Sequence, residues 1–251
     1  FKGTELILPS IYTLKNTNNV ANLLDAGTQK RNAGVFADVT LSYKDYLFLN
    51  GTARNDWSST LPKDNNSYFY PSVSASFIAT EAFKIDSNIL SFLKFRAGYA
   101  KVGKDATAEF LNTSFFLGTA FNSMPTIFNG LSIGDQGIEP EFTTEFEYGT
   151  DIELFNRKVI LDLSFYNKET TNLITPVVVP ASSGYSTFNT NVGAMTNKGI
   201  EVGLTLTPIR TENFKWTLFS NFTKNRNKVT KLVDGLDRYA LDVNEIAYAT
   251  V

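Results

Sequence analysis

Apolar and polar side chains alternate with a two-residue period along eight stretches of this chain. In the stretch 158–168, odd positions carry Val159, Leu161, Leu163 and Phe165, whereas most even positions are polar. Because successive side chains of a strand point to opposite faces, each stretch presents one apolar and one polar surface. The pattern predicts strands over Arg31–Tyr43, Tyr46–Asp56, Phe69–Thr80, Ser91–Gly103, Phe142–Leu154, Lys158–Thr170, Asn191–Thr207 and Phe214–Asn225.

The connections between these strands decide between a soluble sandwich and a membrane barrel, since both show the alternation. Lys44-Asp45, Phe155–Arg157 and Pro208–Asn213 are short and Glu81–Leu90 is intermediate, whereas Trp57–Tyr68, Lys104–Glu141 and Thr171–Thr190 are long. Short turns on one rim and long loops on the other are typical of outer-membrane barrels. Many stretches also reach the ten or so residues that cross a bilayer at a tilt. We therefore expect an all-β, antiparallel transmembrane barrel segment of about eight strands, with periplasmic short turns and extracellular long loops.

Charged side chains gather on the polar parity of the predicted strands. The residues expected to face the lumen are Lys94, Arg96, Glu145, Glu147, Asp151, Glu153 and Glu201. A basic residue facing lipid near the midplane costs about 2–4 kcal/mol, which this placement avoids. The carboxylates in 145–153 are alternatively a metal site or an acid/base pair. We favour a hydrated lumen wall, partly neutralised by Lys and Arg of neighbouring strands.

Aromatic residues mark the short-turn ends of the strands. Because amphipathic rings prefer the bilayer interface, we interpret one set as a girdle, although strands favour aromatics generally. This girdle comprises Tyr43, Tyr46, Phe155, Phe214 and Trp216. A second group of large residues has the opposite parity, which indicates either a lumen filled by a plug or local bulges. That group comprises Phe36, Phe48, Ile160, Tyr166 and Phe219.

Composition excludes several functional classes. The 251 residues include no Cys and no His, so disulfides, thiolate metal sites and the commonest general base are absent. The net charge of −2 argues against nucleic-acid binding. No apolar run approaches the length of a membrane helix. We expect no cofactor and no enzymatic activity. From the residues at its two ends, we interpret the chain as an internal segment of one longer barrel domain.

Several runs resemble the barrel of the SusC/RagA family of TonB-dependent outer-membrane transporters. They occur in the family's order: YKDYL at 43–47, ARNDWSS at 53–59, YPSVSASF at 70–77, EAF at 81–83, LKFRAGY at 93–99, NVGAMTNKGIE at 191–201, Trp216, and NFTKN at 221–225. The resemblance covers most of the chain from about residue 31 onward and is specific only when the runs are taken together.

This resemblance implies a 22-stranded barrel with a plugged lumen in the outer membrane of a Bacteroidetes bacterium. It further implies a SusD-like surface lipoprotein as a lid, energy drawn from TonB through the plug, and import of oligosaccharides or peptides. The plug, the TonB box and most barrel strands are not among these residues. Family signatures here are structural, so no catalytic residue is carried over.

Two other functions compete with active import: a passive porin, and a non-transporting surface β-protein that binds glycans. The second should have a polar outer face, whereas the apolar parity here is nearly free of charge. Aromatic rings in or beside the long loops are candidate contacts for substrate or lid, and loop packing is an equal alternative. These residues are Trp57, Tyr68, Phe69, Tyr70, Phe115, Phe116, Phe121 and Phe128.

Overall fold

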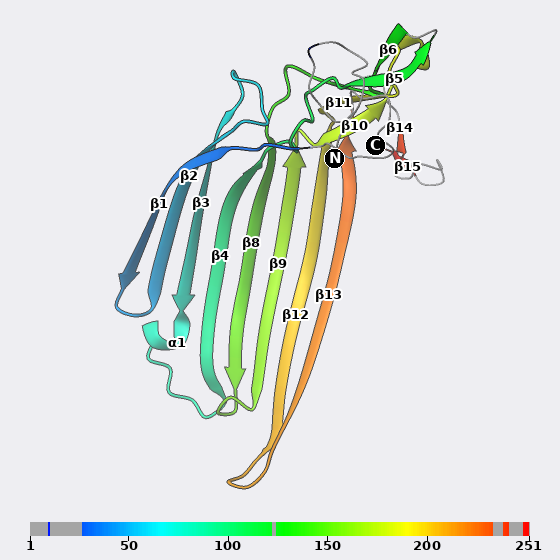
Figure 1. Cartoon of the computed structure of the whole chain (residues 1–251). Coiled ribbons are helices and arrows are strands. Elements are labelled where there is room, and N and C mark those ends of the chain that lie inside the picture. Colours follow the sequence, from blue (N-terminus) through cyan, green and yellow to red (C-terminus); the bar gives the residue numbers. More distant parts are fainter. Residues whose placement is uncertain (1–9, 11–26, 122–123, 233–237, 241–247, 251) are drawn as a thin grey trace.

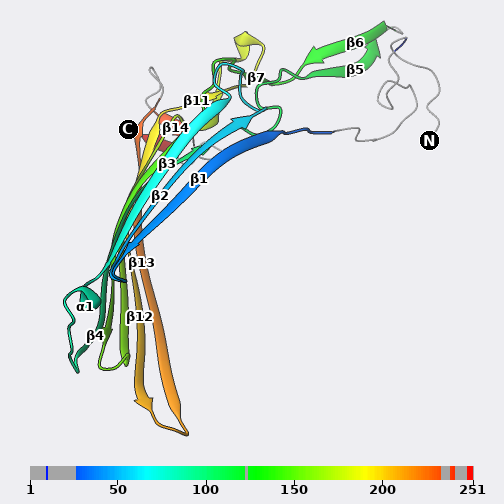
Figure 2. The ribbon, with the colours of Figure 1, turned by 90° about the vertical axis from the view of Figure 1, so that its left-hand side faces the viewer.

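The computed structural model describes residues 10, 27–121, 124–232, 238–240 and 248–250, and its main element is one curved antiparallel sheet (Figures 1 and 2). Eight strands follow one another in the order β1-β2-β3-β4-β8-β9-β12-β13. Their bounds are β1 Asn32–Tyr43, β2 Leu47–Ser58, β3 Ser67–Ile78, β4 Leu90–Lys104, β8 Glu141–Leu154, β9 Val159–Thr171, β12 Ala194–Arg210 and β13 Lys215–Lys231. The eight strands expected from the sequence are thus confirmed, with ends shifted by a few residues.

Tight turns join the strands at one end of the sheet. Lys44 and Asp45, between β1 and β2, both have positive φ, the conformation that two-residue hairpin turns require. Between β8 and β9 three consecutive residues, Phe155 to Arg157, adopt it. After β3 a four-residue helix, α1 (Ala79–Ala82), begins the intermediate connection to β4. No helix in the described part of the chain is long and apolar enough to cross a membrane.

The long connections lie together at the other end of the sheet and contain structure of their own (Figure 1). β5 (Phe115–Phe121) and β6 (Met124–Asn129) form a separate hairpin that projects beyond the sheet in Figure 2. β10 (Ile174–Val178), β11 (Thr187–Asn191) and β7 (Ser132–Gly134) form a three-stranded sheet, with the short helix η2 (Ala181–Ser183) between β10 and β11. Two short strands, β14 (Arg238–Ala240) and β15 (Tyr248–Thr250), pair with each other.

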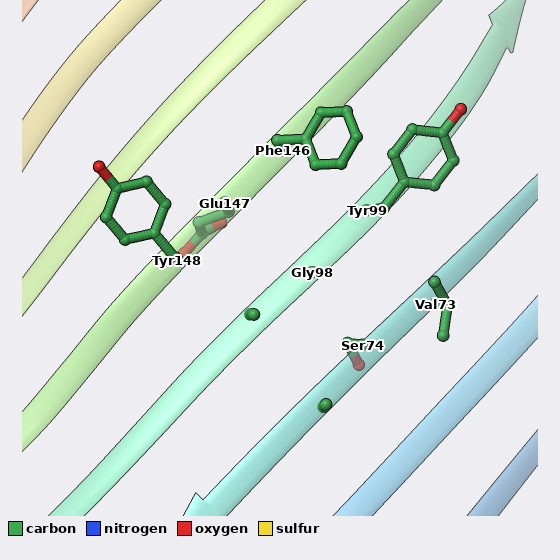
Figure 3. A pocket seen from close by; sticks show the side chains of 9 residues that line it. Val73, Ser74, Gly98, Tyr99, Phe146, Glu147 and Tyr148 are labelled. Carbon is green, nitrogen blue, oxygen red and sulfur yellow. The ribbon is translucent and has the colours of Figure 1, made fainter.

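The register of the eight strands separates an apolar from a polar face. Leu163 pairs with Val202, and Val202 with Phe222, so these apolar side chains share one face. In Figure 3 this face is toward the viewer: Tyr99 and Phe146 project forward, and Glu147 lies behind the ribbon. The strands there run in the opposite left-to-right order from Figure 1, in which the hollow side of the sheet faces the viewer. The polar face is therefore concave.

Large residues of the opposite parity do lie on the polar face. Phe36 pairs with Arg54, and Phe48 with Ser76, in uninterrupted ladders. Ile160, Tyr166 and Phe219 pair with Glu153, Glu147 and Thr205 in the same manner. The alternative that local bulges turn these residues outward is wrong, because the register shifts of the wall lie elsewhere, near residues 90–92, 194–195 and 206–209.

The predicted aromatic girdle lies at the tight-turn end of the sheet. Tyr43 and Tyr46 pack edge to face with ring centroids 5.6 Å apart, and Tyr46 meets Phe77 at 5.9 Å. Phe155, Phe214 and Trp216 are each about half exposed. Toward the other rim the apolar face carries two further ring pairs, Tyr99 with Phe146 at 4.8 Å and Tyr148 with Phe165 at 5.1 Å. The sequence analysis did not predict this second set.

Candidate functional site

A charged network occupies the middle of the polar face and centres on Arg96 of β4. Arg96 donates to Asp162 at 2.6 Å and to Ser164 at 2.5 Å, both on β9, and pairs with Asp151 of β8. The guanidinium reaches β9 because Gly149 of β8, its ladder partner, carries no side chain. A Cβ at Gly149 would lie 2.8 Å from the Arg96 Nε atom. One guanidinium thereby links three strands of the wall.

The other predicted lumen-facing residues share this face and are largely paired. Lys94 contacts Asp151 at 2.7 Å, and Lys168 contacts Glu145 at 3.1 Å. Arg157 contacts Glu153 at 3.0 Å, and Arg96 lies 3.9 Å from Glu147. Glu201 faces Ser164 and Thr223 across its two ladders. The described residues contain no group of three or more acidic side chains arranged to hold a metal ion. The ion pairs thus neutralise most of the charges that the sequence places on the polar face.

Toward the rim with the long connections, β2 and β3 carry aromatic and charged side chains on the polar face. Arg54 of β2 binds both carboxylate oxygens of Asp56, with Nε at 2.9 and 3.0 Å. The hydroxyl of Tyr70 on β3 donates to Asp56 at 2.5 Å. Tyr70 stacks on Tyr68 with a centroid separation of 6.0 Å. The Nε–H of Arg54 and the hydroxyl of Tyr70 thus both bind Asp56 on the polar face of the sheet.

The β3–β4 ladder opens at this rim, and the ring of Tyr68 fills the opening. Pairing between the two strands ends at Ser72 with Ala100, directly after Pro71, which has no N–H to donate. Tyr68 is 6% exposed and packs against Gly103 of β4, where any side chain would collide with the ring. It belongs to a buried apolar cluster with Leu61, Ala106 and Ile138 that holds the long connections to the wall.

Asp105, just beyond β4, ties three segments together at the same rim. Its carboxylate accepts hydrogen bonds from Lys30 at 2.7 Å, from Ser58 at 2.5 Å and from Thr60 at 3.3 Å. Burial by itself raises the pKa of Asp105, but these hydrogen bonds and the charge of Lys30 outweigh it, so the pKa lies below its usual value. Asp105 is therefore ionised at neutral pH and fixes the start of β1 against the ends of β2 and β4.

The eight aromatic residues predicted to contact substrate or lid fall into three groups. Trp57 and Phe69 lie on strand ends and face the apolar side, 41% and 55% exposed. Tyr68 packs loops, as the alternative interpretation held, and Tyr70 faces the polar side. The remaining four lie on the β5–β6 hairpin, where they are exposed: Phe115, Phe116, Phe121 and Phe128.

Sequence reasoning did not single out several residues of the site. Asp162, Ser164 and Gly149 were visible only as polar or small positions within predicted strands, and nothing in their spacing marks them as partners of Arg96. Arg54 and Asp56 lie in the run ARNDWSS, which resembles the SusC/RagA family but carries no signal for the contact between these two residues. Asp105 lies in a non-periodic connection that carries no signal for its contacts.

Comparison with known proteins identifies close likenesses over nearly the whole chain. The family model described as "TonB dependent receptor-like, beta-barrel" matches residues 7–248. TonB-dependent receptor P26 of Formosa agariphila is 30% identical across 97% of this chain and 26% of its own length. TonB-dependent receptor SusC of Bacteroides thetaiotaomicron is 31% identical across 76% of this chain and 20% of its own length.

Solved structures agree in fold. The structure of the RagAB peptide transporter matches with a TM-score of 0.79 at 24% identity, covering 85% of this chain and 24% of the matched chain. The siderophore receptor PirA from Pseudomonas aeruginosa matches with a TM-score of 0.53 at 15% identity, over 78% of this chain and 34% of that one. The chain thus spans about a fifth to a third of the length of these relatives and solved structures.

Proposed function

Because the chain belongs to the TonB-dependent receptor-like β-barrel family, we propose that it forms part of the wall of an outer-membrane importer of oligosaccharides or peptides. The resemblance of the sequence to SusC/RagA transporters is confirmed. Import is energised by TonB through a plug that other residues of the whole protein supply, within a barrel of 22 strands. A SusD-like lipoprotein closes the extracellular side.

The observation that carries this proposal is the continuous separation of two faces over eight strands. On the apolar face Leu163, Val202 and Phe222 form one unbroken row, as contact with lipid requires. On the concave face Arg96 and Lys94 pair with Asp151, and Arg96 also pairs with Asp162. A soluble β-protein would bury the first face against a second layer, which the described residues do not provide.

The large aromatic residues on the concave face support a plugged lumen over an open pore. Phe36 and Phe219 point to that side with 71% and 77% of their surface exposed. Facing open water, these rings would gain nothing from their apolar surface, whereas a plug packed against them would bury it. The proposal of active import therefore ranks above that of a passive porin.

The β5–β6 hairpin is the part of the chain best suited to contact the lid or the substrate. Phe116 stacks on Phe128 with ring centroids 5.6 Å apart, and Phe115 and Phe121 are about two-thirds exposed. Exposed apolar clusters of this kind mark interaction surfaces. The hairpin is closed at its base by a hydrogen bond of 2.6 Å from the Gly130 N–H to the Ser114 carbonyl.

This closed base allows a precise deletion. Removing residues 115–129 and joining Ser114 to Gly130 should leave the wall folded, because the hairpin pairs only with itself among the described strands. We expect the full-length protein to copurify with a SusD-like lipoprotein, and the deletion variant to lose that partner while remaining heat-modifiable on gels. Retention of the partner by the deletion variant would assign the contact to another loop.

Transport itself is tested in cells that express the full-length protein. Uptake of labelled oligosaccharides and of labelled peptides should be measured with and without a functional TonB. Loss of uptake without TonB supports active import, and the labelled class that enters identifies the substrate. Uptake that persists without TonB would identify a passive porin.

A further inference from the structure

A cluster of four cations lies on the apolar face of β12 and β13, where the sequence analysis expected almost no charge. Lys198 pairs directly with Arg226 across the ladder, and Lys224 and Lys228 flank Arg226 on the same side of β13. All four side chains are exposed. Their parity is that of Ile200 and Phe222, so they project outward from the wall and not into the lumen. We call this set the basic cluster.

The basic cluster has no anionic partner within the described chain. Each of the ion pairs of the structure involves other residues. The acidic residue nearest in register on this face is Glu169 of β9, which stands opposite Thr196 and forms no ion pair. Like charges directly opposite one another destabilise a sheet. An anion from outside these strands would therefore stabilise the opposed pair of Lys198 and Arg226.

The level of the cluster on the wall indicates which anion is available. Following the ladders from β4 to β13, one row contains Tyr99, Phe146, Asn167, Lys198 and Arg226. Tyr99 and Phe146 belong to the second set of rings on the apolar face, and Figure 3 shows them projecting together from neighbouring strands. Aromatic rows of this kind lie at the boundary between hydrocarbon and headgroups. The cations thus stand where lipid headgroups begin.

We propose that the basic cluster binds the phosphate groups of anionic lipids in the outer leaflet. The planar guanidinium of Arg226 can hold a phosphate through two parallel hydrogen bonds, and Lys198, Lys224 and Lys228 supply further donors around it. Apolar residues on the side nearer the tight turns, Ile200, Val202 and Phe222, contact the acyl chains of the same lipid. An acidic protein surface is the competing occupant. We favour lipid because the four cations project outward from the wall at the level of the aromatic row.

The test uses the full-length protein in phosphatidylcholine vesicles, with spin-labelled phosphatidic acid or spin-labelled phosphatidylcholine as the probe. The measured quantity is the fraction of each probe that is immobilised at the protein surface. The variant is K198Q/R226Q, which neutralises one directly opposed pair. The matched control is R210Q/K215Q, a second directly opposed pair of the same two strands that lines a hollow on the polar face with Thr205, Thr207 and Thr217.

The wild-type protein should prefer the phosphatidic acid probe, and the preference should weaken as salt is added. K198Q/R226Q should lower the preference by at least about fivefold, whereas R210Q/K215Q should match the wild type. Equal loading of vesicles with heat-modifiable barrel shows that both variants fold. An unchanged preference in K198Q/R226Q, or none in the wild type, would overturn the proposal. Loss of a copurifying acidic protein from K198Q/R226Q, without a change in probe preference, would assign the cluster to a protein partner instead.

Discussion

The guanidinium of Arg96 on β4 lies over Gly149 on β8, and through the space left by the missing side chain it reaches Asp162 on β9 at 2.6 Å. Arg96 and Gly149 are ladder partners, so the register between β4 and β8 sets this contact. As a result Arg96, whose side chain is 26% exposed, pairs with side chains of two other strands, β8 and β9. Gly149 therefore matters because it leaves the space through which Arg96 reaches the carboxylate of Asp162.

Replacing Gly149 with Ala should therefore weaken the folded barrel. The new Cβ would lie 2.7 Å from the Leu163 carbonyl oxygen and 2.8 Å from the Arg96 Nε atom, so the guanidinium must leave Asp162 or Ser164. We expect a loss of about 1–3 kcal/mol, the usual result of leaving a hydrogen-bonded polar group unsatisfied. The measurement is the fraction of heat-modifiable barrel across a urea series.

Gly203→Ala is the matched control for this change. Gly203 lies on the same polar face of β12 and pairs with Asp162, but a Cβ there would lie 3.6 Å or more from its neighbours. It should leave the urea midpoint unchanged. Equal losses from both substitutions would mean that strand propensity, and not the Arg96 contact, explains the effect.

Sequence periodicity was sufficient to predict the strands and faces of the wall but not its contacts. The two-residue period fixes which side Arg96 and Asp151 occupy, because a strand offers only two faces. It does not give the register between strands that are far apart in sequence, and the Arg96–Asp162 pair depends on that register. Nor does it show that Gly149 is the gap through which the side chain passes.

The rim with the long connections was least predictable, since those segments have no period to read. For Tyr68 the sequence left contact with substrate or lid and packing between loops as equal alternatives, and the structure shows the ring buried where the β3–β4 ladder opens. The expectation of an almost uncharged apolar parity also failed, at Lys198 and Arg226 of the β12–β13 ladder. The two-residue period predicts which face a residue occupies, but it gives no information on whether a loop residue is buried or on where charges enter the apolar face.

The assignment of the faces predicts different outcomes for neighbouring residues of one strand. Leu204→Arg places a cation on the apolar face, in the row of Leu161 and Ile152, and should cost about 2–4 kcal/mol at the midplane of the bilayer. Thr205→Arg places the same cation on the polar face and should be tolerated. Both are measured as the yield of heat-modifiable barrel in outer-membrane fractions. Similar losses from the two would indicate that both faces are buried in protein.

The lowered pKa of Asp105 predicts a pH dependence confined to the rim. A carboxylate whose pKa is depressed on folding stabilises the structure above its ordinary pKa of 3.8, and the contribution is lost as the pH falls through the lower folded value. Asp105→Asn should therefore accelerate amide exchange at Ser59 and Thr60 at pH 7. The difference from wild type should begin to shrink as the pH falls below 3.8, and it should vanish below the lower pKa of the folded protein, where the wild-type carboxylate is also protonated.

Asp64→Asn is the control for the loss of one negative charge. Asp64 lies in the same connection between β2 and β3, and its side chain is exposed. It should leave exchange at Ser59 and Thr60 unchanged at every pH. If Asp64→Asn and Asp105→Asn behaved alike, the effect would belong to the net charge of the rim and not to the hydrogen bonds of Asp105.

The two rims of the wall should lie on opposite sides of the outer membrane, with the tight turns in the periplasm. The chain has no cysteine, so single introduced cysteines in this segment report on their own positions. Cysteines replacing Asn129 at the end of β6 and Ser183 in η2 should react with a membrane-impermeant maleimide on intact cells, because both side chains are exposed at the rim with the long connections. A cysteine replacing Asp45 should react only after the outer membrane is permeabilised. Labelling of position 45 alone on intact cells would reverse the orientation, and with it the assignment of the basic cluster to the outer leaflet.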